Sequence, residues 1–229
     1  QRTFSSSIKY FNSAKKDLET ILKSELEFEK NDAFSLEKYH QDWLASSGFQ
    51  IINVEDKVLA ELVKKNGNEI IHVYFDVVQI TNSPFENEMD EQDDEQLIDE
   101  NNEDGELRNL VNDTIANVNV VIENTTDNSA IGIDLLLSVS NNKFAINGLS
   151  HFEDATLALS ETAEADSKRQ LKYNGPPFSN LAEELQDSLT GYLTSRGIDE
   201  QLGDFIVAYS TVKENNEYIS WLTNLKKFF

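Results

Sequence analysis

Carboxylate side chains are concentrated in one short stretch of this chain and are its most distinctive chemical feature. Such a run cannot bury enough apolar surface to offset its ordering entropy, so we predict a solvated loop between two strands. Its negative field would attract cationic partners at low salt. We interpret it as a partner-binding loop; the alternative is a solvated spacer without a ligand. The stretch covers residues 86–106 and contains no Lys or Arg and twelve acids, namely Glu86, Glu88, Asp90, Glu91, Asp93, Asp94, Glu95, Asp99, Glu100, Glu103, Asp104 and Glu106.

Calcium binding would be the obvious chemistry for these carboxylates, but the spacing does not support it. If Glu100, Asn102, Asp104 and Gly105 occupy positions 1, 3, 5 and 6 of an EF-hand loop, position 12 falls on Val111. That position requires a bidentate glutamate. We therefore predict no metal site.

No catalytic motif is recognisable elsewhere in the sequence. The three histidines, His40, His72 and His151, are far apart, and none belongs to a His-Glu-x-x-His arrangement. The sequence contains no Gly-x-Ser-x-Gly elbow, phosphate-binding loop or dinucleotide fingerprint. We predict a protein without enzymatic activity and without a cofactor. The alternative is an enzyme that uses paired carboxylates.

Composition limits the class of protein further. The 229 residues carry a net charge of −23, and 39% of them are hydrophobic, which predicts one large folded domain or two small ones. This charge argues against direct binding of nucleic acid, which depends on Lys and Arg, and favours basic partners. The absence of cysteine excludes disulfides, a thiol nucleophile and a thiolate zinc site. No run of about 18 to 20 apolar residues predicts a transmembrane segment.

The first sixteen residues differ from the rest of the chain. They carry Arg2, Lys9, Lys15 and Lys16 but no acid, and they include the Ser-rich stretch Arg2–Ser7. This composition is typical of the end of a mitochondrial transit peptide, although a chain trimmed for expression would look the same. We interpret residues 1–16 as a residual leader and residues 17–229 as a single acidic domain.

The elements that position these residues follow from apolar periodicity. Three- and four-residue steps from Phe11 to Leu26 predict an amphipathic helix, whereas residues 31–47 are left open between a helical turn and an anchored loop. β-branched and aromatic residues predict strands at 49–54, 58–65, 70–80, 118–122, 131–139 and 144–149, with hairpin turns at Asn66-Gly67 and Asn141-Asn142. Residues 171–173 would add a seventh strand, after a small helix within 154–166.

Two helices are predicted to end the chain. Gly175-Pro176-Pro177 closes the β region, Asn180 has the form of an N-cap, and Gly197 and Asp199 separate the two helices. The last helix has coiled-coil spacing from Leu202 to Ile219, with Asn216 at a core position. It either covers its own sheet or forms a seam between subunits. Candidate interface residues on the first and last helices are Leu18, Leu22, Tyr209, Val212, Ile219, Trp221, Leu222 and Leu225.

Three sequence stretches carry a resemblance to a known family. Asn117–Ile122 (NVNVVI), Gly175–Leu181 (GPPFSNL) and Glu214–Leu222 (ENNEYISWL) resemble the fungal branch of the mitochondrial glycoprotein family. The similarity extends from about Asp17 to the end of the chain. The resemblance implies an α+β fold in which a seven-stranded, strongly twisted antiparallel sheet is flanked by one N-terminal and two C-terminal helices. It also implies that three subunits form a ring-shaped homotrimer around a channel.

The resemblance further implies a function. Family members are acidic proteins of the mitochondrial matrix without enzymatic activity, with no agreed catalytic residues to transfer. The expected role is that of a scaffold or chaperone that binds basic mitochondrial proteins and supports mitochondrial ribosome assembly, translation and respiratory function. The alternative is a fixed structural subunit or assembly factor of one particular large mitochondrial complex.

Overall fold

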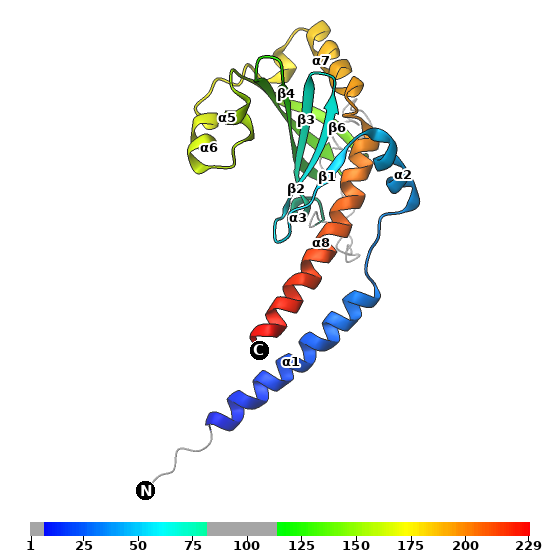
Figure 1. Cartoon of the computed structure of the whole chain (residues 1–229), viewed down its shortest axis with the longest axis vertical. Helices are drawn as coiled ribbons and strands as arrows, with labels where there is room; N and C mark the ends of the chain where they lie inside the picture. Colours follow the sequence, from blue (N-terminus) through cyan, green and yellow to red (C-terminus); the bar gives the residue numbers. More distant parts are fainter. Residues whose placement is uncertain (1–6, 82–113) are drawn as a thin grey trace, which may run out of the picture.

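The computed structural model describes residues 7–81 and 114–229, with side chains from residue 14 onward in the first helix. Helices and strands are combined in an α+β fold (Figure 1). The elements before the undescribed segment are α1 (Ser7–Asn31), α2 (Lys38–Ser47), β1 (Gln50–Ile52), β2 (Leu59–Asn66), β3 (Glu69–Asp76) and α3 (Val77–Thr81). Those after it are β4 (Ile115–Asn124), β5 (Ser129–Ser138), β6 (Lys143–Phe152), α5 (Ala155–Leu159), α6 (Ala163–Gln170), the 3₁₀ turn η1 (Phe178–Asn180), α7 (Glu183–Ser195) and α8 (Glu200–Phe228).

The sheet is an antiparallel meander in which every strand pairs with its neighbours in the chain. The described residues form six strands in the order β1-β2-β3-β4-β5-β6. The prediction of a strand at residues 171–173 is wrong, because these residues leave the end of α6 as a turn and irregular chain. The β2–β3 turn also differs from the prediction by one residue. Asn66 pairs with Glu69, so the loop is Gly67-Asn68, with φ of 60° at Gly67.

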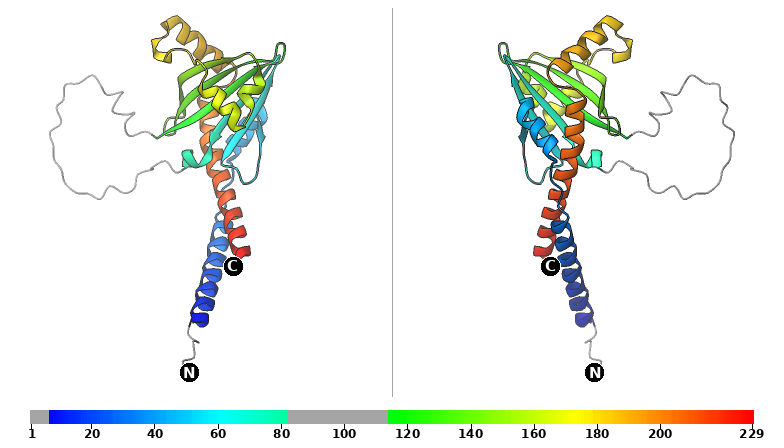
Figure 2. Two further views of the ribbon diagram at one scale, coloured as in Figure 1. Left: turned by 90° about the vertical axis from the view of Figure 1, so that its left-hand side faces the viewer. Right: turned by 90° about the vertical axis from the view of Figure 1, so that its right-hand side faces the viewer.

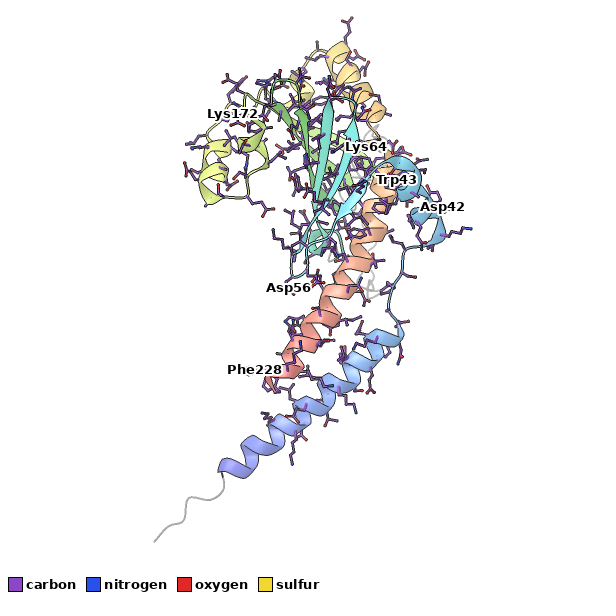
Figure 3. The ribbon with its side chains drawn as sticks, in the orientation of Figure 1. Asp42, Trp43, Asp56, Lys64, Lys172 and Phe228 are labelled. Carbon is purple, nitrogen blue, oxygen red and sulfur yellow. The ribbon has the colours of Figure 1, made fainter. Side chains whose placement is uncertain are left out.

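One face of the sheet carries the main core. Alternate residues of β2 to β5, such as Leu62, Val73, Val120 and Leu135, are buried against the first half of α8. Their spacing of two is the expected consequence of strand geometry. Trp43 of α2 stacks on a phenylalanine of α8 with ring centroids 4.7 Å apart (Figure 3). Residues 38–47 of the segment left open in the sequence are therefore a helix that closes this core, whereas residues 32–37 are irregular chain.

Two short segments also differ from expectation. Residues 77–80 were predicted to continue a strand but form α3, because the Asp76 carboxylate accepts hydrogen bonds from the backbone N–H groups of Val78 and Gln79 at 2.8 and 3.1 Å. Such capping favours a helical turn over further ladder pairing. The small helix predicted within 154–166 is two helices, α5 and α6.

The C-terminal helices confirm two of the three predicted boundary signals. Gly197 has φ of 88° after α7, and the Asp199 side chain accepts from the N–H groups of Gln201 and Leu202 at the start of α8. Asn180 is not an N-cap, because it belongs to η1 and α7 begins at Glu183 without a side-chain cap.

The first and last helices form a pair that extends beyond the sheet. α1 runs beside the second half of α8, away from the strands (Figures 1 and 2). Leu22 and Leu26 of α1 bury their side chains against Leu222 of α8. α8 therefore covers its own sheet with one half and pairs with α1 through the other. Asn216, predicted at a core position, is exposed.

Candidate partner-binding surface

The acidic segment 86–106 lies outside the described residues, so all twelve of its acids do as well. The structure does describe the residues at which the chain leaves the folded body and returns to it, Thr81 and Thr114. α3, which ends at Thr81, buries Val77 and Ile80 and packs against α8. On the return, the carbonyl of Thr114 accepts a hydrogen bond from the N–H of Val139 at 2.9 Å, immediately before β4. The chain therefore leaves and re-enters the body at fixed positions.

The sheet face opposite α8 carries a second group of acids. We call it the open face; α5 and α6 stand on this side of the sheet, whereas α2 and α8 lie on the other (Figure 1). His72 Nδ1 lies 2.8 Å from Glu61 Oε1, and His72 Nε2 lies 3.9 Å from Glu123 Oε2. Burial, followed by the charge of Glu61, raises the pKa of Tyr74 well above its usual range. Tyr74 therefore presents a neutral phenol beside these carboxylates.

A row of polar side chains crosses the open face. The strand register aligns Glu61 with Tyr74, Tyr74 with Asn119, and Asn119 with Asp134. Asn119 Nδ2 donates to Asp134 Oδ1 at 2.7 Å. The next position, on β6, is Gly148, which contributes no side chain. The row therefore ends in a carboxylate with open space on its outer side.

The α5–α6 hairpin stands over part of this face. Val121, Ala130 and Phe152 of the sheet pack against Ala155 and form a small second core. Arg169 of α6 fixes the hairpin by donating to the carbonyls of Leu157 and Ser160 at 2.9 and 2.6 Å. A groove of about 400 Å³ remains between the hairpin and the strands. Its wall includes Tyr74, Asn119, Val121, Asp134, Phe152 and Glu161.

The residues predicted at a subunit interface have different environments. Leu22 and Leu222 are buried in the contact between α1 and α8, with Leu18, Ile219 and Leu225 packed around them. Tyr209 belongs to the main core, and Val212 is partly buried. Trp221 stacks on Tyr218 and remains 56% exposed. The structure thus uses most of these residues within one chain, and an interface role for them remains a prediction.

Several large apolar side chains on the α1–α8 pair are exposed. Ile21 and Phe28 of α1 are 63% and 64% exposed, and Phe228 near the free end of α8 is 79% exposed (Figure 3). With Trp221 they leave apolar surface on a pair of helices that projects from the body. Such surface is typical of contacts with other protein chains.

Two polar contacts that were not predicted from the sequence hold the body together. The Glu69 carboxylate accepts hydrogen bonds from Arg196 Nε and Nη2, both at 3.0 Å, and from the Tyr192 hydroxyl at 2.8 Å. Lys213 of α8 is buried, and its Nζ donates to the Val54 carbonyl and to Glu217. Period-two alternation within the predicted strands could have located the open-face acids. No local sequence signal marks Lys213 as buried.

The histidines remain separate in the fold. His40 Nε2 lies 3.2 Å from Asp204 Oδ2, His72 lies on the open face, and His151 is exposed on β6. Across residues 7–81 and 114–229, no three or more His, Asp or Glu side chains are grouped in a way that could hold a metal ion. In the same ranges, no helix is long and apolar enough to cross a bilayer.

These features define a class: an acidic α+β protein whose antiparallel meander is packed against one long C-terminal helix, with a projecting pair of terminal helices. Residues 22–229 match the mitochondrial glycoprotein family, also described as MAM33. The chain belongs to this family, which confirms the resemblance found in the sequence, and the family is one of mitochondrial acidic proteins.

Individual relatives agree with this assignment. The mitochondrial acidic protein mam33 of Schizosaccharomyces pombe is 31% identical over 210 residues, which cover 90% of this chain and 76% of the relative. An uncharacterized mitochondrial protein of Arabidopsis thaliana is 39% identical over 77 residues, or 33% of this chain and 31% of that protein.

Solved structures share the fold. A hypothetical protein of Leishmania major, described as a sequence homologue of human p32, superposes with a TM-score of 0.69 at 24% identity, covering 94% of this chain and 98% of that one. The p22 protein of Trypanosoma brucei gives a TM-score of 0.66 at 23% identity, with the same two coverages.

Proposed function

We propose that this protein is a non-enzymatic acidic scaffold or chaperone of the mitochondrial matrix that binds basic proteins and thereby supports mitochondrial ribosome assembly, translation and respiratory function. The observation that carries the proposal is the distribution of charge. Of a net charge of −23, about half is concentrated in residues 86–106, attached to the body between α3 and β4. Such a field attracts cationic proteins over a distance set by the ionic strength.

The proposal includes a homotrimer in which apolar contacts oppose charge repulsion. Assembly of three copies triples the net charge of −23. Burial of exposed apolar side chains on the α1–α8 pair, such as Ile21, Phe28 and Trp221, supports association. Each Å² of apolar surface removed from water contributes roughly 25 cal/mol. Salt screens the acids over about 8 Å at physiological ionic strength, which weakens the repulsion between subunits.

The two kinds of contact should respond oppositely to salt. Raising the salt concentration should weaken binding of a basic protein such as lysozyme, because the attraction between charges is screened. The trimer should remain intact or become stronger. Calorimetric titration and light scattering at low and high salt measure the two responses. Dissociation of the trimer as salt rises would show that this division between charged and apolar contacts is wrong.

A pair of variants tests the acidic segment itself. Deletion of residues 86–106 should preserve folding and assembly but lower affinity for the basic protein. A second variant, in which the twelve acids are replaced by the corresponding amides, retains the segment's length. Equal loss of affinity in both variants assigns the effect to charge. Unchanged affinity in both would reduce the segment to a spacer.

The second candidate function is a fixed structural subunit or assembly factor of one particular large mitochondrial complex. Exposed apolar side chains on the projecting helix pair favour it, because contacts of this kind depend on shape more than on charge. Recovery of one partner complex from mitochondrial extract at high as well as low salt would support this function over the first.

A further inference from the structure

We propose that the groove between the open face and the α5–α6 hairpin is a binding site for an arginine side chain of a basic partner protein. The inference rests on the proposed function, since it gives one specific place where a cationic partner is held. The groove has a volume of about 400 Å³, within the range of sites that enclose small groups.

The groove offers the two surfaces that a guanidinium group requires. Aromatic and aliphatic side chains, Tyr74, Val121 and Phe152, form part of its wall and suit the apolar stem and the planar head of arginine. Asp134 supplies a carboxylate in the same wall. The wall also contains Arg169, whose guanidinium is held by hydrogen bonds to two carbonyls of the α5–α6 hairpin. The Tyr74 ring can contact the guest cation through its face.

Asp134 is the carboxylate best placed to receive the guest. Its Oδ1 accepts a hydrogen bond from Asn119 Nδ2 at 2.7 Å, which fixes its orientation. A Cβ atom at Gly148 would lie 3.7 Å from Asp134 Oδ2, and no other atom would lie within 4 Å of it. Within the described ranges, no cation forms an ion pair with Asp134. Oδ2 therefore faces unoccupied space beside the groove.

The protein already uses this chemistry within its own fold. The guanidinium of Arg196 lies 3.9 Å from the centroid of the Tyr192 ring while it pairs with both oxygens of Glu69. Two lysines make related contacts with residues of the groove wall. Lys57 Nζ pairs with Glu161 at 2.9 Å, and Lys172 Nζ lies 5.4 Å from the centroid of Phe152, on the same side of the sheet as α5 and α6 (Figure 3). The Lys57–Glu161 pair is exposed, so a guest cation can exchange with it at little cost.

The test uses the full chain and a blocked tetra-arginine peptide as the probe. Asp134→Asn removes one charge from the groove but leaves a side chain that can bond with Asn119. Glu183→Gln removes one charge from the exposed start of α7 and is the matched control. We expect Asp134→Asn to weaken binding about tenfold and Glu183→Gln less than twofold, since a charge-assisted hydrogen bond contributes more than a distant charge.

Two further measurements leave the Asp134 carboxylate unchanged. In the wild-type protein, the Asn119 side-chain amide resonances should shift as the peptide is added, whereas those of Asn224 near the end of α8 should not. Gly148→Leu, which fills the space beside Asp134 without changing charge, should reduce affinity as Asp134→Asn does.

The possible failures are distinguishable. Equal, small losses for Asp134→Asn and Glu183→Gln, with salt-sensitive binding of lysozyme retained, would overturn the groove site and leave the proposed function standing. Absence of binding of both the peptide and lysozyme at low salt would overturn both.

Discussion

Replacement of Gly203 by alanine should destabilise the protein, although alanine is the better helix former. A Cβ atom at this position of α8 would lie 2.3 Å from the carbonyl oxygen and 2.9 Å from the carbonyl carbon of Asn142, in the β5–β6 turn. Both atoms belong to the backbone, so the clash can be relieved only by moving the β5–β6 turn or α8 itself. Overpacking of this kind costs up to about 3 kcal/mol. The gain in helix propensity returns about 1 kcal/mol, so we expect a net loss of up to about 2 kcal/mol.

Gly191 provides the matched control. It lies inside α7, and a Cβ atom there would meet nothing within 4 Å. Gly191→Ala should therefore stabilise the protein by about 1 kcal/mol. Urea unfolding followed by circular dichroism, at one protein concentration for all three proteins, gives the free energies of unfolding. If Gly203→Ala proved as stable as Gly191→Ala, the close docking of α8 on the β5–β6 turn would be refuted.

Two further predictions concern the contacts of the body and of the helix pair. The pKa of Glu69 is lowered in the folded protein, mainly by hydrogen bonds from Arg196. Its ionised carboxylate therefore stabilises the fold at pH values above the ordinary glutamate pKa of about 4.3. This stabilisation is lost as the pH falls through the lowered pKa of Glu69 in the folded state. Glu69→Gln should thus lower the free energy of unfolding, measured by urea unfolding, by about 2 kcal/mol at pH 7. The loss should become progressively smaller below a pH of about 4. An equal loss at pH 7 and in this acidic range would contradict the prediction. Leu222 is 2% exposed and Trp221 56%, so Leu222→Asp should speed hydrogen exchange in α1, whereas Trp221→Asp should leave that exchange unchanged and weaken association only.

Much of the fold was predictable because period-two and period-three-to-four patterns are local. The strands β2 to β6 and the helices α1, α7 and α8 are confirmed with shifts of a few residues at their ends. The failures arise where a short-range polar contact decides the outcome. Asp76 ends β3 by capping α3. The N–H of Asn180 donates to the carbonyl of Pro177 in a 3₁₀ turn, and α7 begins three residues later. Irregular chain at 171–173 shows that a short apolar stretch is not sufficient for a strand.

The candidate surface was less predictable than the fold. The charge of residues 86–106 is evident in the sequence, but the acids Glu61, Glu123 and Asp134 are scattered along the chain and come together only through strand register. Leu185 of α7 is exposed although it lies at four-residue spacing, through Leu189, from the buried Leu193. A helix that contacts the body along part of its length carries the same apolar spacing as one that is fully covered.

The pairing of the first helix with the last has a consequence for biosynthesis. The contact between Glu25 and Tyr218 joins residues 193 positions apart, so α1 cannot pack against α8 until nearly the whole polypeptide has been delivered. A chain that emerges amino terminus first, from a ribosome or through a membrane pore, therefore displays the leucines of α1 uncovered while the sheet is already forming. A truncated product that lacks the second half of α8 keeps that stripe exposed to solvent.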